Sequence, residues 1–262
     1  MYGFLFKKSF CDGWDNLLSV IITNLVCLFS GFGLIFLASL VIESTPLLLL
    51  VFIFGCAVIS VLTFAYGDIA ADIANFKGIR IADYFRAIPG ALKDGSLFGL
   101  MVAVITIVSF IGLDYYFLQT TSLVGIFLGA CLLWIDIFLV LSLQWFLPIR
   151  SLMHNGFRKC LKKCFIIFFD NTGFSVLIGL YNLVMTALSV LFVGFIPSFA
   201  GILIGNTNAL RIRLYKYDYL EEHPELKTKK ERRQIPWEEL IYDDRETLGP
   251  RKLKSFIFPW KD

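Results

Sequence analysis

The sequence predicts an all-α membrane protein with six transmembrane helices arranged as three hairpins and with interfacial amphipathic helices on the cytoplasmic side. Of its 262 residues, 57% are hydrophobic and 17% are charged, whereas soluble domains are nearer half apolar and a quarter charged. Apolar runs of about 20 residues recur, the length that a helix needs to cross about 30 Å of hydrocarbon. Apart from Arg211 and Arg213 at the end of the last run, the basic residues fall in the segments between or beyond these runs. The predicted solvent of the chain is therefore the lipid bilayer.

Six apolar runs are predicted to span the membrane. Short polar turns separate the first run from the second, at Glu43-Ser44-Thr45-Pro46, and the third from the fourth, at Gln119-Thr120-Thr121-Ser122. The predicted spans are 17–42, 47–66, 96–118, 123–147, 172–195 and 197–214. Residues 1–217 are thus predicted to form a transmembrane domain, and residues 218–262 a charged cytoplasmic tail.

The distribution of basic residues predicts the orientation. All 24 Lys and Arg lie in the N-terminal segment, in the connections 67–95 and 149–171, or from Arg211 onward. The turns on the opposite side carry none. Because cytoplasmic loops are enriched in Lys and Arg, we expect a multi-pass protein of the inner membrane with both termini in the cytoplasm.

Three aspartates precede the ascending helices of the three predicted hairpins. Asp12, Asp94 and Asp170 each follow a basic segment and are followed by Gly or Asn and then by an apolar run. An aspartate there can accept from free backbone N–H groups and suits the positive end of the helix dipole. We therefore interpret these residues as helix caps. The repetition is consistent with duplicated hairpins or with chance similarity between interfacial loops.

The connection 149–171 has the pattern of an amphipathic helix. Apolar residues recur at helical spacing, and Arg150, Arg158, Lys162 and Lys163 take the other face. A helix of this kind lies in the headgroup plane and meets anionic lipid headgroups with its basic side. Because membrane orientation already explains the charge, no nucleic acid is expected as a partner.

The tail mixes acidic and basic side chains with several Pro and Gly, which is typical of short helices or disorder. Its end, Phe256-Ile257-Phe258-Pro259-Trp260, is aromatic and follows three basic residues. This end is expected to dock on the membrane surface or on the helix bundle, or else to serve as an exposed partner motif.

Asp136 is the first candidate for chemistry inside the membrane. It lies near the middle of the fourth span, where a carboxylate is costly and no Lys or Arg can pair with it. Asn182 and Asn24 lie at comparable depths, and Asn206 and Asn208 follow two glycines in the sixth span. Together these residues form a candidate intramembrane polar site that binds a proton or a substrate. The alternative is a set of polar contacts that hold helices together.

Metal, cofactor and catalytic motifs are not found. Cys160 and Cys164 are four residues apart with His154 nearby, but they occupy the apolar face of a basic helix and do not complete a zinc site. No metallopeptidase, phosphate-loop or serine-hydrolase signature occurs. The chain is therefore not expected to be an enzyme, and no cofactor is expected.

Several soft patterns in residues 1–217 are shared with a known family: Trp14-Asp15-Asn16-Leu17, Tyr66-Gly67-Asp68-Ile69-Ala70, Asp83-Tyr84-Phe85-Arg86, Lys93-Asp94-Gly95-Ser96 and Gly205-Asn206-Thr207-Asn208-Ala209-Leu210. In these the chain resembles the YesL-like family of small bacterial membrane proteins, although the long charged tail departs from it. The resemblance implies a six-helix inner-membrane protein of unassigned activity. Relatives often accompany carbohydrate uptake systems, which implies an accessory role.

Two functions follow as hypotheses. The first is a non-enzymatic accessory or scaffold component that contacts a membrane-protein partner through its cytoplasmic loops and tail. The second is a small proton-coupled transporter or permease with Asp136 in its site. The two differ in whether the intramembrane carboxylate or the cytoplasmic surface carries the activity.

Overall fold

The computed structural model describes residues 1–226, 231 and 234–251, and within these ranges the regular elements are all helical. Five helical stretches are long and apolar enough to cross a membrane: Leu17–Leu40, Thr45–Ala74, Ile81–Gln119, Leu123–Met153 and Thr172–Leu191. The all-helical class and the presence of membrane-spanning helices are therefore confirmed. Six spans are not, because the predicted run 197–214 is not one of the five.

That run lies in α9 (Ser198–Glu222), which is the central helix of the fold. Its apolar part is interrupted by Asn206 and Asn208 and ends at Arg211. The side chains from Ile204 to Leu210 are buried, and α9 contacts α1, α2, α3, α6 and α8. Because protein rather than lipid surrounds this helix, its surface does not need the apolar character of a lipid-facing span.

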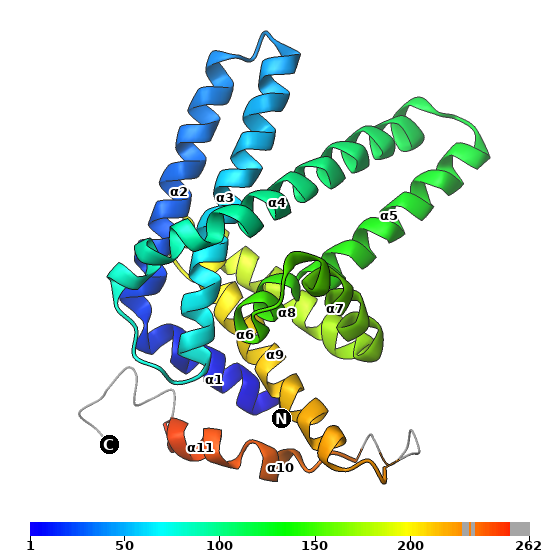
Figure 1. Ribbon diagram of the computed structural model, residues 1–262. Coiled ribbons are helices and arrows are strands. Elements are labelled where there is room, and N and C mark those ends of the chain that lie inside the picture. Colours follow the sequence, from blue (N-terminus) through cyan, green and yellow to red (C-terminus); the bar gives the residue numbers. More distant parts are fainter. Residues whose placement is uncertain (227–230, 232–233, 252–262) are drawn as a thin grey trace.

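The longest helices form two hairpins that diverge from a shared base (Figure 1). The first pairs α2 (Leu17–Leu40) with α3 (Thr45–Ala74). The second pairs α4 (Ile81–Asp114) and the π-helical turn η1 (Tyr115–Gln119) with α5 (Leu123–Leu143). The helix α8 (Thr172–Leu191) precedes α9 near the base. The shorter helices lie away from the two hairpin turns: α1 (Tyr2–Asp15), α6 (Phe146–Met153), α7 (Phe157–Asp170), α10 (Trp237–Leu240) and α11 (Tyr242–Leu248).

The connection predicted at 67–95 is mostly helical. The helix α3 continues beyond residue 66, the predicted end of its span, to Ala74. The third span was predicted to begin at residue 96, but α4 already begins at Ile81, where the Asp83 carboxylate accepts from the backbone N–H of Arg80 at 2.9 Å. Residues 81–95 of the predicted connection are therefore the first part of α4 rather than a separate interfacial helix.

The connection 149–171 also differs from its prediction as a single amphipathic helix. Residues before Met153 belong to α6, and α7 begins at Phe157 after His154, whose φ of 49° breaks the helix. Within α7 the predicted faces are confirmed except at Lys163, which is half-buried. Cys160, Cys164 and Phe168 are buried, and the side chains of Arg158 and Lys162 are exposed.

Small residues allow α3 and α4 to pack backbone to backbone. Ala91, Gly95, Gly99 and Ala103 are spaced four apart on α4, and all are buried. A Cβ at Gly99 would lie 2.5 Å from the Cys56 carbonyl oxygen, and one at Gly95 would lie 2.8 Å from the Val61 Cα. Small side chains at this spacing are typical of close helix pairs in membranes. This crossing fixes the inner halves of the two hairpins against each other.

Candidate functional site

The residues predicted to share one intramembrane site do not come together. Asp136 lies between α5 and α4, where the Ser109 hydroxyl donates to its Oδ1 at 2.7 Å. Asn182 donates from Nδ2 to Gln144 Oε1 at 3.1 Å, which joins α8 to the end of α5. The two side chains thus make separate interhelical contacts, and the prediction that they share a site is wrong.

Asn24 has a different role from the one predicted. Its Nδ2 donates to the carbonyl oxygens of Phe195 and Pro197 at 2.8 and 2.9 Å, and its Oδ1 accepts from the backbone N–H of Ala200 at 3.0 Å. A side chain of α2 therefore satisfies the backbone groups of the turn between α8 and α9. Backbone groups in a turn and at the first turn of a helix have no intrahelical partner. The Asn24 amide therefore supplies hydrogen bonds that these groups would otherwise lack.

Asn206 and Asn208 are both buried in α9 and are also separated in their contacts. Asn208 donates from Nδ2 to Asp12 Oδ2 at 2.8 Å. The Oδ1 of Asn206 has no hydrogen-bond partner among the described residues. Asn208 therefore belongs to a polar cluster with Asp12 at the base of the fold.

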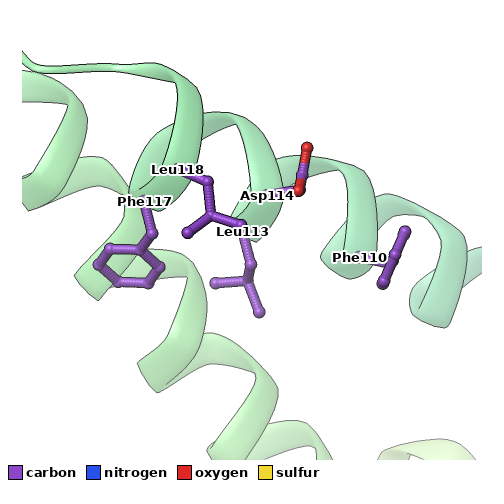
Figure 2. Close-up of a pocket in the computed structure, with 5 residues that line it drawn as sticks. All are labelled: Phe110, Leu113, Asp114, Phe117 and Leu118. Atoms are coloured by element: carbon purple, nitrogen blue, oxygen red, sulfur yellow. The ribbon is translucent and has the colours of Figure 1, made fainter.

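A pocket lies at the far end of the second hairpin. It is an open depression lined by Phe110, Leu113, Asp114, Phe117 and Leu118. Figure 2 shows the Asp114 carboxylate on the other side of the helix from Leu113 and Phe117. That carboxylate accepts from Gln119 Nε2 at 2.7 Å. Binding sites combine an apolar lining with convergent polar groups, and this depression lacks the second component.

The prediction that three aspartates cap helices is wrong in each case. Asp12 lies within α1, and α2 begins only at Leu17. Asp94 lies in the interior of α4. Asp170 is the last residue of α7, and no side-chain hydrogen bond caps the start of α8. The helices α2 and α8 begin after Asn16 and Asn171 rather than after the aspartates, and residue 94 lies within α4, so none of the three carboxylates is at an N-cap position. All three carboxylates are used in contacts between elements.

Asp12 belongs to a buried polar cluster where α1 meets α9. Lys8 Nζ donates to Asp12 Oδ2 at 2.8 Å, and the same oxygen accepts from Asn208. Lys8 is 0% exposed, and its ammonium lies 3.7 Å from the centre of the Phe76 ring. Burial lowers the pKa of Lys8 and raises that of Asp12, and in each residue the ion pair opposes the effect of burial. The cluster ties α1, α9 and the end of α3 together.

A second contact joins α9 to the tail. Arg211 donates to both Asp244 oxygens, from Nη1 at 2.8 Å and from Nη2 at 3.0 Å. The Tyr215 hydroxyl donates to the same carboxylate at 3.2 Å. Burial and the adjacent carboxylate raise the pKa of Tyr215 to about 12, so its hydroxyl stays protonated as a donor. A bidentate arginine pair of this kind is among the stronger polar contacts.

The third aspartate joins α7 to the C-terminal half of α9. Asp170 Oδ2 accepts from the Tyr217 hydroxyl at 2.7 Å and from Lys216 Nζ at 3.0 Å. Burial alone would raise the pKa of Asp170, but the hydrogen bonds from Tyr217 and Lys216 outweigh it and hold the pKa below its usual value. The carboxylate is therefore ionised at neutral pH.

Arg150 does not face lipid headgroups as predicted. Its side chain is 14% exposed, and it bridges α3 and α4 through Asp68 at 2.8 Å and Asp94 at 3.4 Å. Lys163 is partly buried, with its ammonium 3.6 Å from the Met153 sulfur. Arg158 and Lys162 remain exposed on α7, as the headgroup prediction requires. The headgroup prediction is therefore wrong for Arg150. This residue is near the start of the predicted connection 149–171, but it lies in α6, where its side chain faces the carboxylates of Asp68 and Asp94.

Most of these contacts have no signal in the sequence. Arg211 and Asp244 are 33 residues apart, and Arg150 and Asp68 are 82 apart. The spacing of Lys8 and Asp12 is the exception, because residues four apart share one face of a helix. The aromatic end of the tail, 256–260, lies outside the described residues. Among the described residues, no group of three or more His, Cys, Asp or Glu could hold a metal ion.

The polar residues of this base act by joining elements. Three ion pairs connect helices that are distant in sequence: Arg150–Asp68, Arg211–Asp244 and Lys216–Asp170. The fourth, Lys8–Asp12, lies within α1, and Asn208 joins it to α9. Such an arrangement builds a rigid surface on which another molecule can dock. No family model, curated protein or solved structure matches the chain.

Proposed function

We propose that the chain is an integral inner-membrane protein with six membrane-crossing helices and both termini in the cytoplasm. In this proposal it acts as a non-enzymatic accessory or scaffold component for a membrane partner. The five apolar helices support membrane insertion, and the distribution of Lys and Arg supports the orientation. The sixth crossing is α9, shielded from lipid by the helices around it.

The observation that carries the proposal is the contrast between the polar groups at the base of the fold and the polar groups within the apolar helices. We name the base formed by α1, α6, α7, the C-terminal half of α9 and α10–α11 the cytoplasmic platform. Ion pairs and buried side chains order this platform, and its outer surface is charged. Asp136 and Asn182, in contrast, each have a partner on a neighbouring helix. The ordered surface is thus the part of the molecule best suited to contact a partner.

Anionic lipid is a second proposed contact of the platform. Arg158, Lys159 and Lys162 are exposed on α7, together with Ile166 and Phe169 toward its other end. A helix with exposed basic and apolar side chains suits the boundary between headgroups and acyl chains. The resemblance to the YesL-like family, which stays a prediction, would make a carbohydrate uptake system the protein partner.

Proton-coupled transport through Asp136 is the alternative. Asp136 is a carboxylate within an apolar span, and a residue of that kind is a candidate for ion or proton binding. Its hydrogen bond from Ser109 equally fits a structural contact between α4 and α5. Asp136→Asn would abolish uptake if the residue carries transport, and would leave the association of an accessory protein intact.

Affinity purification in mild detergent tests the accessory role. The full-length chain should recover a membrane complex from its native membranes, and a variant lacking residues 223–262 should recover much less. The matched control is a variant lacking only residues 252–262, which keeps the docked helices α10 and α11. Recovery of the same complex by both truncated variants would contradict a role for the docked tail. Asp136→Asn should recover the complex as the wild type does.

A further inference from the structure

Within the cytoplasmic platform, a short acidic segment of the tail docks on α1 and α9. The helices α10 and α11 contain four and seven residues and lie beside α1 and α9 (Figure 1). Helices this short are not stable alone in water, so their form depends on the surface that they contact. Between Trp237 and Leu248 the segment has five carboxylates and one arginine. It is thus an acidic ligand seated on a surface of the same chain.

One carboxylate anchors this segment. Asp244 is 6% exposed and receives both guanidinium N–H groups of Arg211 as well as the Tyr215 hydroxyl. The Arg211 guanidinium also lies 5.4 Å from the ring centres of Phe76 and Tyr215. These aromatic neighbours hold the guanidinium in place, which gives a preorganised carboxylate receptor.

Two apolar side chains flank the anchor. Ile241 and Leu248 are buried in the main core, whereas Tyr242 and Asp243 between them are exposed. The positions 241, 244 and 248 follow the spacing of one helical face, with apolar residues on both sides of the carboxylate. The surface therefore recognises a pattern of apolar, acidic and apolar residues on a short helix.

The remaining contacts are at the edge. Lys7 Nζ donates to the Gly249 carbonyl oxygen at 3.2 Å, and Arg251 pairs with Asp15. Exposed ion pairs such as the latter contribute little. The segment is thus held chiefly by the Asp244 carboxylate and the apolar side chains of Ile241 and Leu248. Trp237 adds a third apolar contact, because it packs against the core with the Arg213 guanidinium 5.4 Å from its ring centre. A contact of this size can be displaced. Because the segment belongs to the same chain as α9, its effective concentration is nevertheless high, about millimolar for a flexible linker.

We propose that the surface formed by Arg211, Tyr215, Phe76 and Lys7 is a receptor for an acidic amphipathic helical segment of a partner protein. Residues 237–249 occupy this receptor in the isolated chain and are displaced by the partner segment. Charge complementarity supports this choice of partner, because the receptor presents Arg211 and Lys7 with the buried Lys8 behind them. The inference rests on the proposed accessory function and names the surface that would carry it.

A labelled peptide tests the receptor directly. The probe is a fluorescein-labelled peptide of residues 234–251, and its binding to the purified full-length protein in mild detergent is followed by fluorescence anisotropy. Asp244→Asn should loosen the resident segment, so this variant should bind the probe with a Kd about tenfold lower than the wild type does, since a hydrogen bond to a charged group is worth about that factor. The matched control is Asp243→Asn, which removes the same charge from the exposed neighbouring side chain and should bind as the wild type does.

Two further variants keep the test decisive. A probe with the Asp244→Asn change should bind the Asp244→Asn protein about tenfold more weakly than the unchanged probe. Arg211→Gln combined with Asp244→Asn should also lose binding; if this protein does not elute as a folded species in size exclusion, Tyr215→Phe with Asp244→Asn replaces it. Equal binding to wild type and Asp244→Asn, no binding to either, or binding that does not depend on the Asp244 carboxylate of the probe would overturn the receptor. Because the probe is the chain's own segment, this result is separate from whether a native partner co-purifies.

Discussion

The inner and outer halves of the second hairpin are held by different contacts. In the inner half, Gly95 and Gly99 bring the backbone of α4 against that of α3, and Arg150 bridges Asp68 and Asp94 beside them. In the outer half, Phe110 is 73% exposed and Leu123 is 83% exposed. The outer contacts of α4 with α5 are made by side chains, such as Leu132 near Gly112. One hairpin therefore has a tightly packed base and an outer arm whose apolar side chains are exposed.

This difference shows which contacts fix the positions of the helices. Backbone contacts and buried ion pairs have few alternative arrangements, because a small displacement leaves polar groups unpaired or atoms overlapping. Apolar side chains in lipid lose little when they exchange protein neighbours for acyl chains. We expect substitutions in the base to cost much more stability than similar substitutions in the arm, and four comparisons test this.

Lys8→Met should have the largest effect. Methionine keeps most of the side-chain volume but removes the ion pair, so the buried Asp12 retains only Asn208. Loss of one partner of a buried pair typically costs about 3–5 kcal/mol. The melting temperature in detergent should fall clearly, and Lys8→Met with Asp12→Leu should recover much of the loss. A single variant that melts like the wild type would show that Asp12 is satisfied by Asn208 alone.

Gly99→Ala should have the second largest effect. Its Cβ would lie 2.5–2.6 Å from backbone atoms of Cys56 and Ala57, which can move only if the helices separate. Overpacking of this kind costs up to about 3 kcal/mol, or a fall in melting temperature of roughly 6–12 °C. Gly112→Ala is the control in the outer arm, because its Cβ meets only the end of the flexible Leu132 side chain, at 2.6 Å. Equal melting temperatures for the two variants would contradict the distinction between base and arm.

Arg150→Gln should have an intermediate effect. It leaves Asp68 and Asp94 without their shared cation and should cost about 1.5 kcal/mol. Arg158→Gln removes the same charge from the exposed face of α7 and should leave the melting temperature in detergent unchanged. If Arg158→Gln were the more damaging of the two, Arg150 would not be the residue that joins α3 and α4.

Asp136→Leu should have the smallest effect. It removes the hydrogen bond from Ser109, and hydrogen bonds between membrane helices contribute about 0.6 kcal/mol on average. Asp136→Asn keeps an acceptor for the Ser109 hydroxyl and should melt as the wild type does. Thermal unfolding of both variants in one detergent measures the difference. A large loss in Asp136→Asn would show that the carboxylate has a further role.

Particular residues show how far sequence patterns reach. The apolar runs predicted the class of the protein, and the alternation of apolar and basic residues predicted both faces of α7. Short-range patterns were misleading where they were read as helix boundaries. Asp12, Asp94 and Asp170 resembled caps because each precedes an apolar run, but α2 and α8 begin after Asn16 and Asn171, and Asp94 lies within α4. Arg150 resembled a headgroup contact because its carboxylate partners are distant in the sequence.

The apolar runs are enough to predict a helical chain that is apolar enough for a membrane, because the length of an apolar run and the period of a helix are local properties. Which polar residues meet follows from the tertiary structure alone. It separated Asp136 from Asn182, joined Asp12 to Lys8 and Asn208, and seated Asp244 on Arg211. These pairings depend on how helices cross in space, and the residues next to a side chain in the sequence do not determine that crossing.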